Sequence, residues 1–213
     1  FSSWDRNGKS QWGANGDAGH YLRTEPNGEA VMMDIDGPGV IYRIWSANPV
    51  GKIRLYLDGA PTAAYEWNFP DLFDGNLPPF VKPLVYRRNT PQSASDCYLP
   101  IPFGKHIKVT ADKAHGQYYH FNYVVFPKDR PVVSFRLPLS ADEQQALNAA
   151  VDIWSHPGGD PKPKLAGQET ILKRITIAPG ETAVLFDIAR SGVIRALRAR
   201  VESQQRYPWR KLV

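Results

Sequence analysis

Short segments rich in β-branched and aromatic residues, separated by frequent turn residues, constrain the fold of this chain most strongly. The 213 residues include 19 Pro and 17 Gly, and Val, Ile, Tyr and Phe gather in the short stretches between them. In "KIRLYLD", Ile53, Leu55 and Leu57 alternate with more polar neighbours, which is the pattern of a strand with one buried face. The pair Asp58-Gly59 then ends this stretch with a turn signal. We therefore predict an all-β fold of many short strands.

Strand-like segments of this kind recur along most of the chain. The predicted strands cover residues 29–36, 40–47, 52–59, 105–112, 118–126, 132–137, 170–178, 182–189 and 192–201. Short strands at regular spacing with tight connections are typical of a β-sandwich, and a domain of this length buries enough apolar surface to fold without disulfides or metals. The single cysteine, Cys97, cannot form an internal bridge.

One helix is predicted to interrupt the strands. Ser140 is followed three residues later by Glu143, at the spacing of a capping box, and good helix formers follow. Its predicted apolar stripe consists of Ala146, Leu147, Ala150, Val151 and Trp154, and we expect Trp154 to lie in the core. The Pro-, Gly- and Lys-rich stretch after the helix reads as a flexible connection.

An internal repeat suggests how the chain is divided. "GPGVIYRIW" at 37–45 is echoed by "RSGVIRALR" at 190–198, and each copy follows an alternating strand, "MMDID" or "LFDIA". Glycine followed by β-branched residues is also common in strands, so this alternative stays open. We predict a first β module at 1–138, a helix and linker at 139–167, and the opening strands of a second, truncated module at 168–213.

Charge and composition exclude some partners. The net charge is +5 and the sequence pI is about 9.3, but the Lys and Arg residues are scattered, so we expect no nucleic-acid partner. No run of about 18 apolar residues is present, so we expect no membrane span. The usual local motifs for nucleotide binding and zinc chemistry are also missing. The five histidines, His20, His106, His115, His120 and His156, share no ligand spacing, so we expect no metal.

Three carboxylates leave a functional role open. Asp34 and Asp36 alternate on one predicted strand and point to the same side, as an acid/base pair or metal cage would, although Asp36 also suits the cap of the following turn. Glu66, between two aromatic residues, is an exposed strand residue or a functional one.

The tryptophans favour a sugar ligand. Trp4 and Trp12 lie in a polar stretch, "FSSWDRNGKSQWGANGDAG", with no apolar run that would bury them. Indole faces stack on the C–H faces of sugar rings, while Asp, Asn and Arg side chains bind sugar hydroxyls. The candidate sugar-binding residues are Ser3, Trp4, Asp5, Arg6, Trp12 and Trp45. Among these, we expect Asp5 to accept hydroxyl hydrogens and Arg6 to orient Asp5 or a ring oxygen.

Five ordered motifs resemble a known family. "SSWDRNG", "DIDGPGVIYRIWSA", "IRLYLDG", "FPDLFDG" and "CYLPIPFGKHIKV" are similar to the amino-terminal half of glycoside hydrolase family one-seventy-two, a bacterial family of α-fructofuranosidases and D-arabinofuranosidases. The resemblance implies a tandem pair of jelly-roll β-sandwiches, a trimer-based homo-oligomer, and retaining hydrolysis of furanosides without a cofactor. The altered loop "NGKSQWGANGD" leaves substrate preference open, and the cellular compartment, periplasmic, secreted or cytoplasmic, is not assigned.

The resemblance also implies where catalysis resides. The catalytic glutamates of that family lie in the second jelly roll, so we expect them after Val213 and expect this segment alone to be inactive. The alternatives are a non-catalytic jelly-roll carbohydrate-binding module and a purely structural assembly module.

Overall fold

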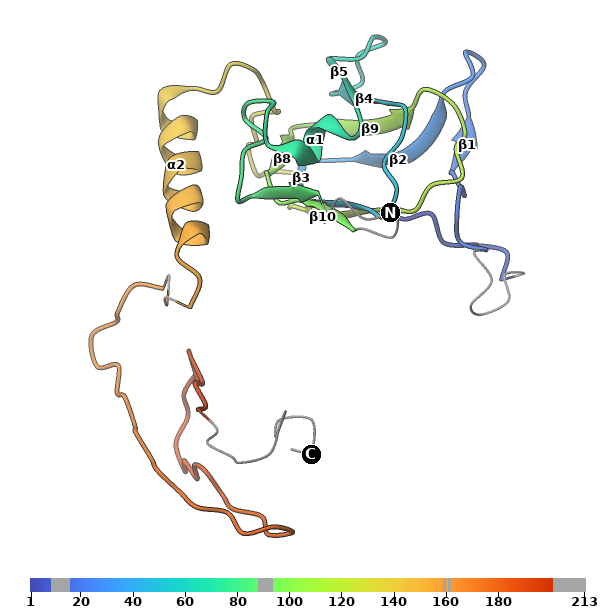
Figure 1. The fold of residues 1–213 in the computed structure, drawn as a ribbon. Helices are drawn as coiled ribbons and strands as arrows, with labels where there is room; N and C mark the ends of the chain where they lie inside the picture. Colours follow the sequence, from blue (N-terminus) through green and yellow to red (C-terminus); the bar gives the residue numbers. More distant parts are fainter. Residues whose placement is uncertain (9–15, 88–93, 159, 161, 201–213) are drawn as a thin grey trace. The chain divides into compact units, whose positions relative to one another are not determined.

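The computed structural model describes residues 1–8, 16–87, 94–158, 160 and 162–200. The chain divides into two compact units, Phe1–Pro157 and Gly158–Val213. The first unit contains every helix and strand found in the described residues (Figure 1).

The elements follow one another in the chain as short strands with two helices among them. In order they are β1 (Arg23–Thr24), β2 (Ala30–Asp36), β3 (Gly39–Ser46), β4 (Lys52–Leu57), β5 (Tyr65–Asn68), α1 (Asp71–Asp74), β6 (Val85–Arg87), β7 (Ser95–Cys97), β8 (Ile101–Phe103), β9 (His106–Ala111), β10 (Tyr119–Val125) and α2 (Ala141–Ser155).

The strands form two antiparallel sheets, which confirms the predicted all-β sandwich. One sheet has the order β1-β2-β9-β4-β5, and the other has the order β10-β3-β7-β6, with β8 also paired to β3. The chain passes from one sheet to the other five times, between β2 and β3, β3 and β4, β5 and β6, β8 and β9, and β9 and β10. A bridge between Ser2 and His120 adds the amino-terminal residues to the free edge of β10.

The core lies between the two sheets and is fully apolar at its centre. Alternate residues of facing strands point inward, so residues such as Ile44, Ile107 and Phe121 are at most 1% exposed. Burying each such side chain contributes about 1.5–3 kcal/mol relative to leaving it in water. An apolar void of about 10 Å³ remains among these side chains. It is at the lower limit for a single water molecule.

The predicted turn at Asp58-Gly59 is formed as the sequence indicates. Asp58 and Gly59 both have positive φ angles, 57° and 80°, and the Ala60 N–H donates to the Leu57 carbonyl at 3.0 Å. These are the features of a type I′ hairpin turn, for which Asp-Gly is a preferred pair. The Asp58 carboxylate also accepts the Lys105 N–H at 2.8 Å, so it ties this turn to the next strand.

Helix α2 begins as predicted but buries less than predicted. Ser140 and Glu143 form the full capping box, and Leu147 packs into the sandwich core. Trp154, expected in the core, is 45% exposed and rests on the Tyr98 ring with the ring centres 4.8 Å apart. The expectation for Trp154 was wrong, whereas Leu147, Ala150 and Val151 of the predicted stripe do pack in or against the core.

The strand predictions were wrong in two places. Residues 132–137 lie along β8 through single hydrogen bonds, such as the Phe135 N–H to the Pro102 carbonyl at 2.8 Å, without forming a ladder. In the described part of the second unit, residues 158, 160 and 162–200, no strand is formed and Leu172 is 97% exposed. A strand needs a neighbour with which to pair, and two-stranded pieces are marginal in water.

The turns before the repeated segments match closely. Gly28 donates its N–H to the Glu25 carbonyl at 2.9 Å, and Glu181 donates to the Ala178 carbonyl at 3.0 Å. Each turn has Pro at its second position. The number of residues between the turn and the start of the repeated segment is the same in both copies. The likeness supports the assignment of residues 168–213 to the start of a second module, which stays a prediction.

We predict that Gly39→Ala destabilises the sandwich by about 1–3 kcal/mol, because overpacking a filled site has this cost. A Cβ at residue 39 would lie 2.6 Å from the Val124 carbonyl oxygen, which β10 pairing holds in place. The equivalent glycine of the repeat, Gly192, has no atom within 4 Å of a built Cβ, so Gly192→Ala is the matched control. Urea unfolding measures both, and equal stabilities would contradict the packing argument.

Candidate functional site

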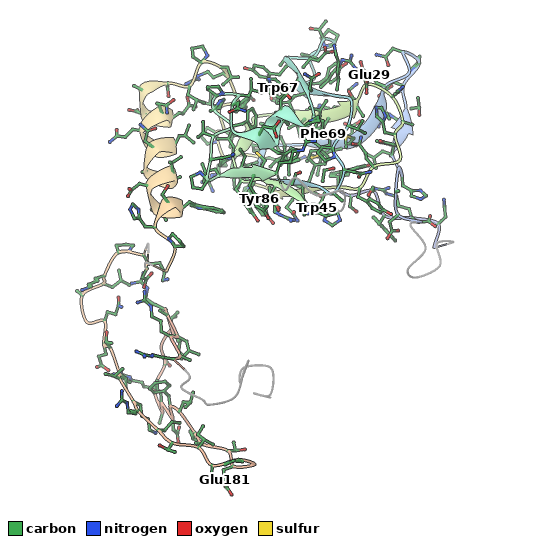
Figure 2. All side chains as sticks on the ribbon, viewed as in Figure 1. Glu29, Trp45, Trp67, Phe69, Tyr86 and Glu181 are labelled. Atoms are coloured by element: carbon green, nitrogen blue, oxygen red, sulfur yellow. The ribbon has the colours of Figure 1, made fainter. Side chains whose placement is uncertain are left out.

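A row of side chains crosses the outer face of the β10-β3-β7-β6 sheet. His120 pairs with Trp45, Trp45 with Asp96, and Asp96 with Tyr86. Directly paired residues of antiparallel strands point to the same side, and the neighbouring row, which includes Ile44, lies in the core. Figure 2 shows Trp45 and Tyr86 along the side of this sheet that faces away from Phe69. We call His120, Trp45, Asp96 and Tyr86 the outer row.

A fixed guanidinium lies beside the outer row. The Arg43 Nε donates to Asp96 Oδ1 at 2.7 Å, and its NH1 donates to Asn122 Oδ1 at 3.1 Å. Desolvation lowers the pKa of Arg43, but the Asp96 hydrogen bond and charge outweigh it and leave that pKa raised. The Arg43 side chain keeps 28% of its surface exposed, so it is both held and accessible.

Trp45 is supported from one side by a histidine. The rings of Trp45 and His120 lie with their centres 4.8 Å apart at an interplanar angle of 37°. Desolvation and then the nearby Arg43 charge lower the pKa of His120. The imidazole is therefore neutral at pH 7 and packs as an aromatic ring against the indole.

The amino-terminal segment lies at the free edge of β10, next to the outer row. The Ser3 N–H donates to the Tyr119 carbonyl at 3.1 Å, and the Tyr119 N–H donates to Ser3 Oγ at 3.2 Å. Ser3 is thereby buried, whereas Trp4, the next residue, is 55% exposed. Because Ser2 pairs with His120, the segment continues the same cross-strand row as Trp45.

Asp5 and Arg6 shape the loop that carries Trp4. Asp5 is 6% exposed, and its Oδ1 accepts the Asn7 N–H at 2.8 Å, while its own N–H donates to Asp17 Oδ1 at 2.9 Å. Arg6 is exposed, and its NH2 donates to the Ser2 carbonyl at 2.9 Å. The expected contacts of Asp5 and Arg6 with sugar hydroxyls stay predictions.

The structure therefore brings together part of the predicted set. Ser3 and Trp4 lie in the segment at the free edge of β10, and Trp45 lies on β3 with His120 of β10 between it and that segment. Trp12 lies outside the described residues. Sequence reasoning missed Tyr86 and the ion pair between Arg43 and Asp96. The sequence could have indicated Arg43, because Arg43 and Trp45 are two residues apart on one predicted strand and so share a face. It could not have indicated Asp96, because no local pattern shows that this strand pairs with residues 95–97.

The carboxylates left open by the sequence are held in ion pairs or exposed. Asp34 lies 2.7 Å from His106 Nε2 and also pairs with Arg23, while Asp36 is exposed at the end of β2. Desolvation by itself would raise the pKa of Asp34. The hydrogen bonds from Arg23 and His106 together have a larger effect in the opposite direction, so this pKa lies below its ordinary value.

Glu66 has a comparable environment. It accepts from Arg54 Nε at 2.6 Å and pairs with Lys52, and the Lys52 hydrogen bond holds the pKa of Glu66 below its usual range. A general acid needs a raised pKa, so the surroundings of Asp34 and Glu66 do not suit them to that role.

A buried glutamate on the outer side of the other sheet was not predicted. Glu29 is 7% exposed and accepts hydrogen bonds from Tyr56 Oη at 2.8 Å and Thr110 Oγ1 at 2.7 Å. Burial and then the Glu29 hydrogen bond raise the pKa of Tyr56 to about 12. Arg54 NH1 lies 3.5 Å from the same carboxylate. These partners satisfy the carboxylate, which is how a buried charge is stabilised structurally.

The part of the chain that the structure describes has neither a metal-binding cluster nor a membrane-spanning helix. No group of three or more His, Cys, Asp or Glu residues there could hold a metal ion. Neither described helix has the length and apolar character needed to cross a bilayer.

The two antiparallel sheets define the first unit as a β-sandwich domain. A family model described as the GH172 first β-sandwich domain matches residues 1–143. The chain therefore belongs to glycoside hydrolase family one-seventy-two, GH172, as the resemblance indicated. No match was found among curated proteins.

We predict that Asp34→Asn lowers stability at pH 7 by up to about 1 kcal/mol, the range for partly exposed ion pairs. Because the folded pKa of Asp34 lies below its unfolded value of about 3.9, this contribution is present above that unfolded value and is lost as pH falls through the folded pKa. Urea unfolding of wild type and variant should therefore converge toward pH 2. Asp36→Asn, on the same strand and face, is the control. A difference that persists undiminished at low pH would contradict the ion-pair account.

Proposed function

We propose that this chain supplies the substrate-binding part of a retaining furanosidase that acts on fructofuranosyl or arabinofuranosyl linkages. The observation that carries the proposal is the family match over residues 1–143, together with a half-exposed Trp4 at the edge of an aromatic sheet face. Trp4 and Trp45 would stack on sugar rings, and Asp5 and Arg6 would form the polar half of the same site.

The chemistry of the described side chains favours binding over cleavage. Retaining hydrolysis needs two carboxyl groups about 5–5.5 Å apart, one a nucleophile and one an acid with a raised pKa. Asp34 and Glu66 are held as carboxylates by cationic partners, and the Glu29 carboxylate is saturated by hydrogen bonds. We therefore propose that the catalytic glutamates lie beyond Val213, in a second module.

The proposed mechanism also bears on the need for a cofactor. A nucleophile and an acid/base carboxylate complete the reaction by themselves, so no cofactor is invoked.

We also propose a trimer-based homo-oligomer, in which the outer face of one copy lies close to the catalytic module of another.

We predict that the 213-residue chain does not hydrolyse p-nitrophenyl arabinofuranosides or fructofuranosyl oligosaccharides, whereas a protein extended by the following module does. The physical reason is that the carboxylates considered among the described residues, Asp34, Glu66 and Glu29, are held by cationic or hydrogen-bonding partners. Release of p-nitrophenol and of reducing sugar, measured side by side for both proteins, tests this. Turnover by the 213-residue chain would contradict the location of the catalytic pair.

We predict that Trp4→Ala weakens furanoside binding by roughly five- to tenfold, the loss of one aromatic stacking contact. Calorimetric titration of the extended protein with a furanosyl trisaccharide measures this. Trp154→Ala is the matched control, because Trp154 is also half exposed but rests on Tyr98 at the helix. An equal loss for both variants would show a general effect on the fold rather than a sugar contact.

A second candidate function is supported by the same aromatic face. A non-catalytic carbohydrate-binding module would bind furanosyl oligosaccharides through Trp4 and Trp45 without any turnover. The extended protein separates the two functions: binding with hydrolysis supports the furanosidase, and binding without hydrolysis supports the module.

A further inference from the structure

The outer row has features that a single stacking tryptophan does not explain. It carries aromatic rings at two places, the partly buried Trp45 and the more exposed Tyr86, with the buried Asp96 between them. Tyr86 is 38% exposed although it is a large aromatic side chain on a short strand. This inference rests on the proposed sugar-binding function and extends it to residues that neither the sequence motifs nor the family match assigns.

The spacing of the row fits an extended ligand. Trp45 and Tyr86 lie two strands apart, a separation of about 10 Å at the usual strand spacing. Two rings at this distance on one flat sheet face can each contact a different unit of a short oligosaccharide. Trp4, at the β10 edge, lies on the other side of Trp45 from Tyr86.

The charges of the row match a neutral, hydroxyl-rich ligand. The Arg43 guanidinium and the Asp96 carboxylate neutralise each other at 2.7 Å, and the Asn122 side chain adds a neutral amide. His120 adds a neutral ring at pH 7. A polyanionic ligand would be attracted by no net positive charge, because the Arg43–Asp96 pair is neutral. An apolar helix would have to bury this charged pair at the centre of its contact, which is costly.

The donors of the row are fixed before any ligand arrives. Arg43 is held by Asp96 from β7 and Asn122 from β10, so its position costs little conformational entropy on binding. The guanidinium held in this way keeps 28% of the Arg43 side chain exposed and presents donors that hydroxyl oxygens accept, whereas the Asp96 carboxylate that holds it is buried.

We propose that the outer row binds a second unit of a neutral furanosyl oligosaccharide, with Tyr86 as its stacking contact and Arg43 as its hydroxyl-binding contact. The unit held by Trp4 lies nearest the amino-terminal segment, and the unit held by Tyr86 and Arg43 lies toward β6. The chain is therefore expected to prefer oligosaccharides over single sugars.

The test is calorimetric titration of the 213-residue chain and of the extended protein with a methyl furanoside, a furanosyl disaccharide and a furanosyl trisaccharide. Wild type is expected to bind the trisaccharide at least fivefold more tightly than the methyl furanoside. Tyr86→Ala is expected to abolish this preference while leaving methyl furanoside affinity unchanged, and Tyr86→Phe is expected to retain it. Tyr42→Ala, a similarly exposed tyrosine outside the row, is the control, and thermal unfolding checks that each variant is folded.

The outcomes separate this inference from the proposed function. If wild type binds no furanoside of any length, the proposed function itself fails. If wild type binds all lengths equally and Tyr86→Ala changes nothing, the site near Trp4 stands and the second sugar position is overturned. If Tyr86→Ala instead changes the sedimentation mass without changing length preference, the row is a contact between copies of the chain, which also overturns the proposal.

Discussion

The pairing of β3 with its neighbours is the constraint on which the rest of the structure depends. This strand hydrogen-bonds to β10 on one side and to β7 and β8 on the other, so it lies at the centre of its sheet. A shift of one residue in this register would move Ile44 out of the core and Trp45 into it. The irregularity in the β3–β10 ladder, where Tyr42 has no direct partner, lets Ile41 and Ile44 both point inward. The positions of the core and of the outer row are therefore set by the same hydrogen bonds.

The outer faces of the two sheets differ in what they can offer a ligand. On the β1-β2-β9-β4-β5 sheet, charged groups are joined in closed sets, as Glu29 is with Tyr56 and Thr110. On the other sheet, the ion pair between Arg43 and Asp96 lies beside Trp45, which is partly buried, and Tyr86, which is exposed. Satisfied buried charges specify and stabilise a fold, whereas aromatic rings beside a fixed polar pair remain able to contact a neutral ligand. This contrast is why the site is assigned to one sheet.

The two copies of the repeat show how far local sequence carries structure. Both segments have alternating apolar residues, and both follow a turn with Pro at its second position. The first copy forms β2 and β3 because β9, β10 and β7 are present to pair with it. In the described residues of the second copy, Val193 and Ile194 are 85% and 74% exposed. The local sequence pattern therefore favours an extended strand, but a strand forms only where neighbouring strands are present to pair with it.

The sequence by itself determined the all-β class, the capping box of α2, the Asp58-Gly59 turn and the family, because each depends on neighbours a few residues apart or on ordered motifs. It also indicated Trp4 as a poorly buried indole. It could not show that Asp5 is buried in its own loop, that Trp154 is half exposed, or that Tyr86 and Asp96 line up with Trp45. Those facts depend on which strands pair and in which register. Only the folded sheet decides this, since hydrogen bonds between distant segments carry no local signature in the chain.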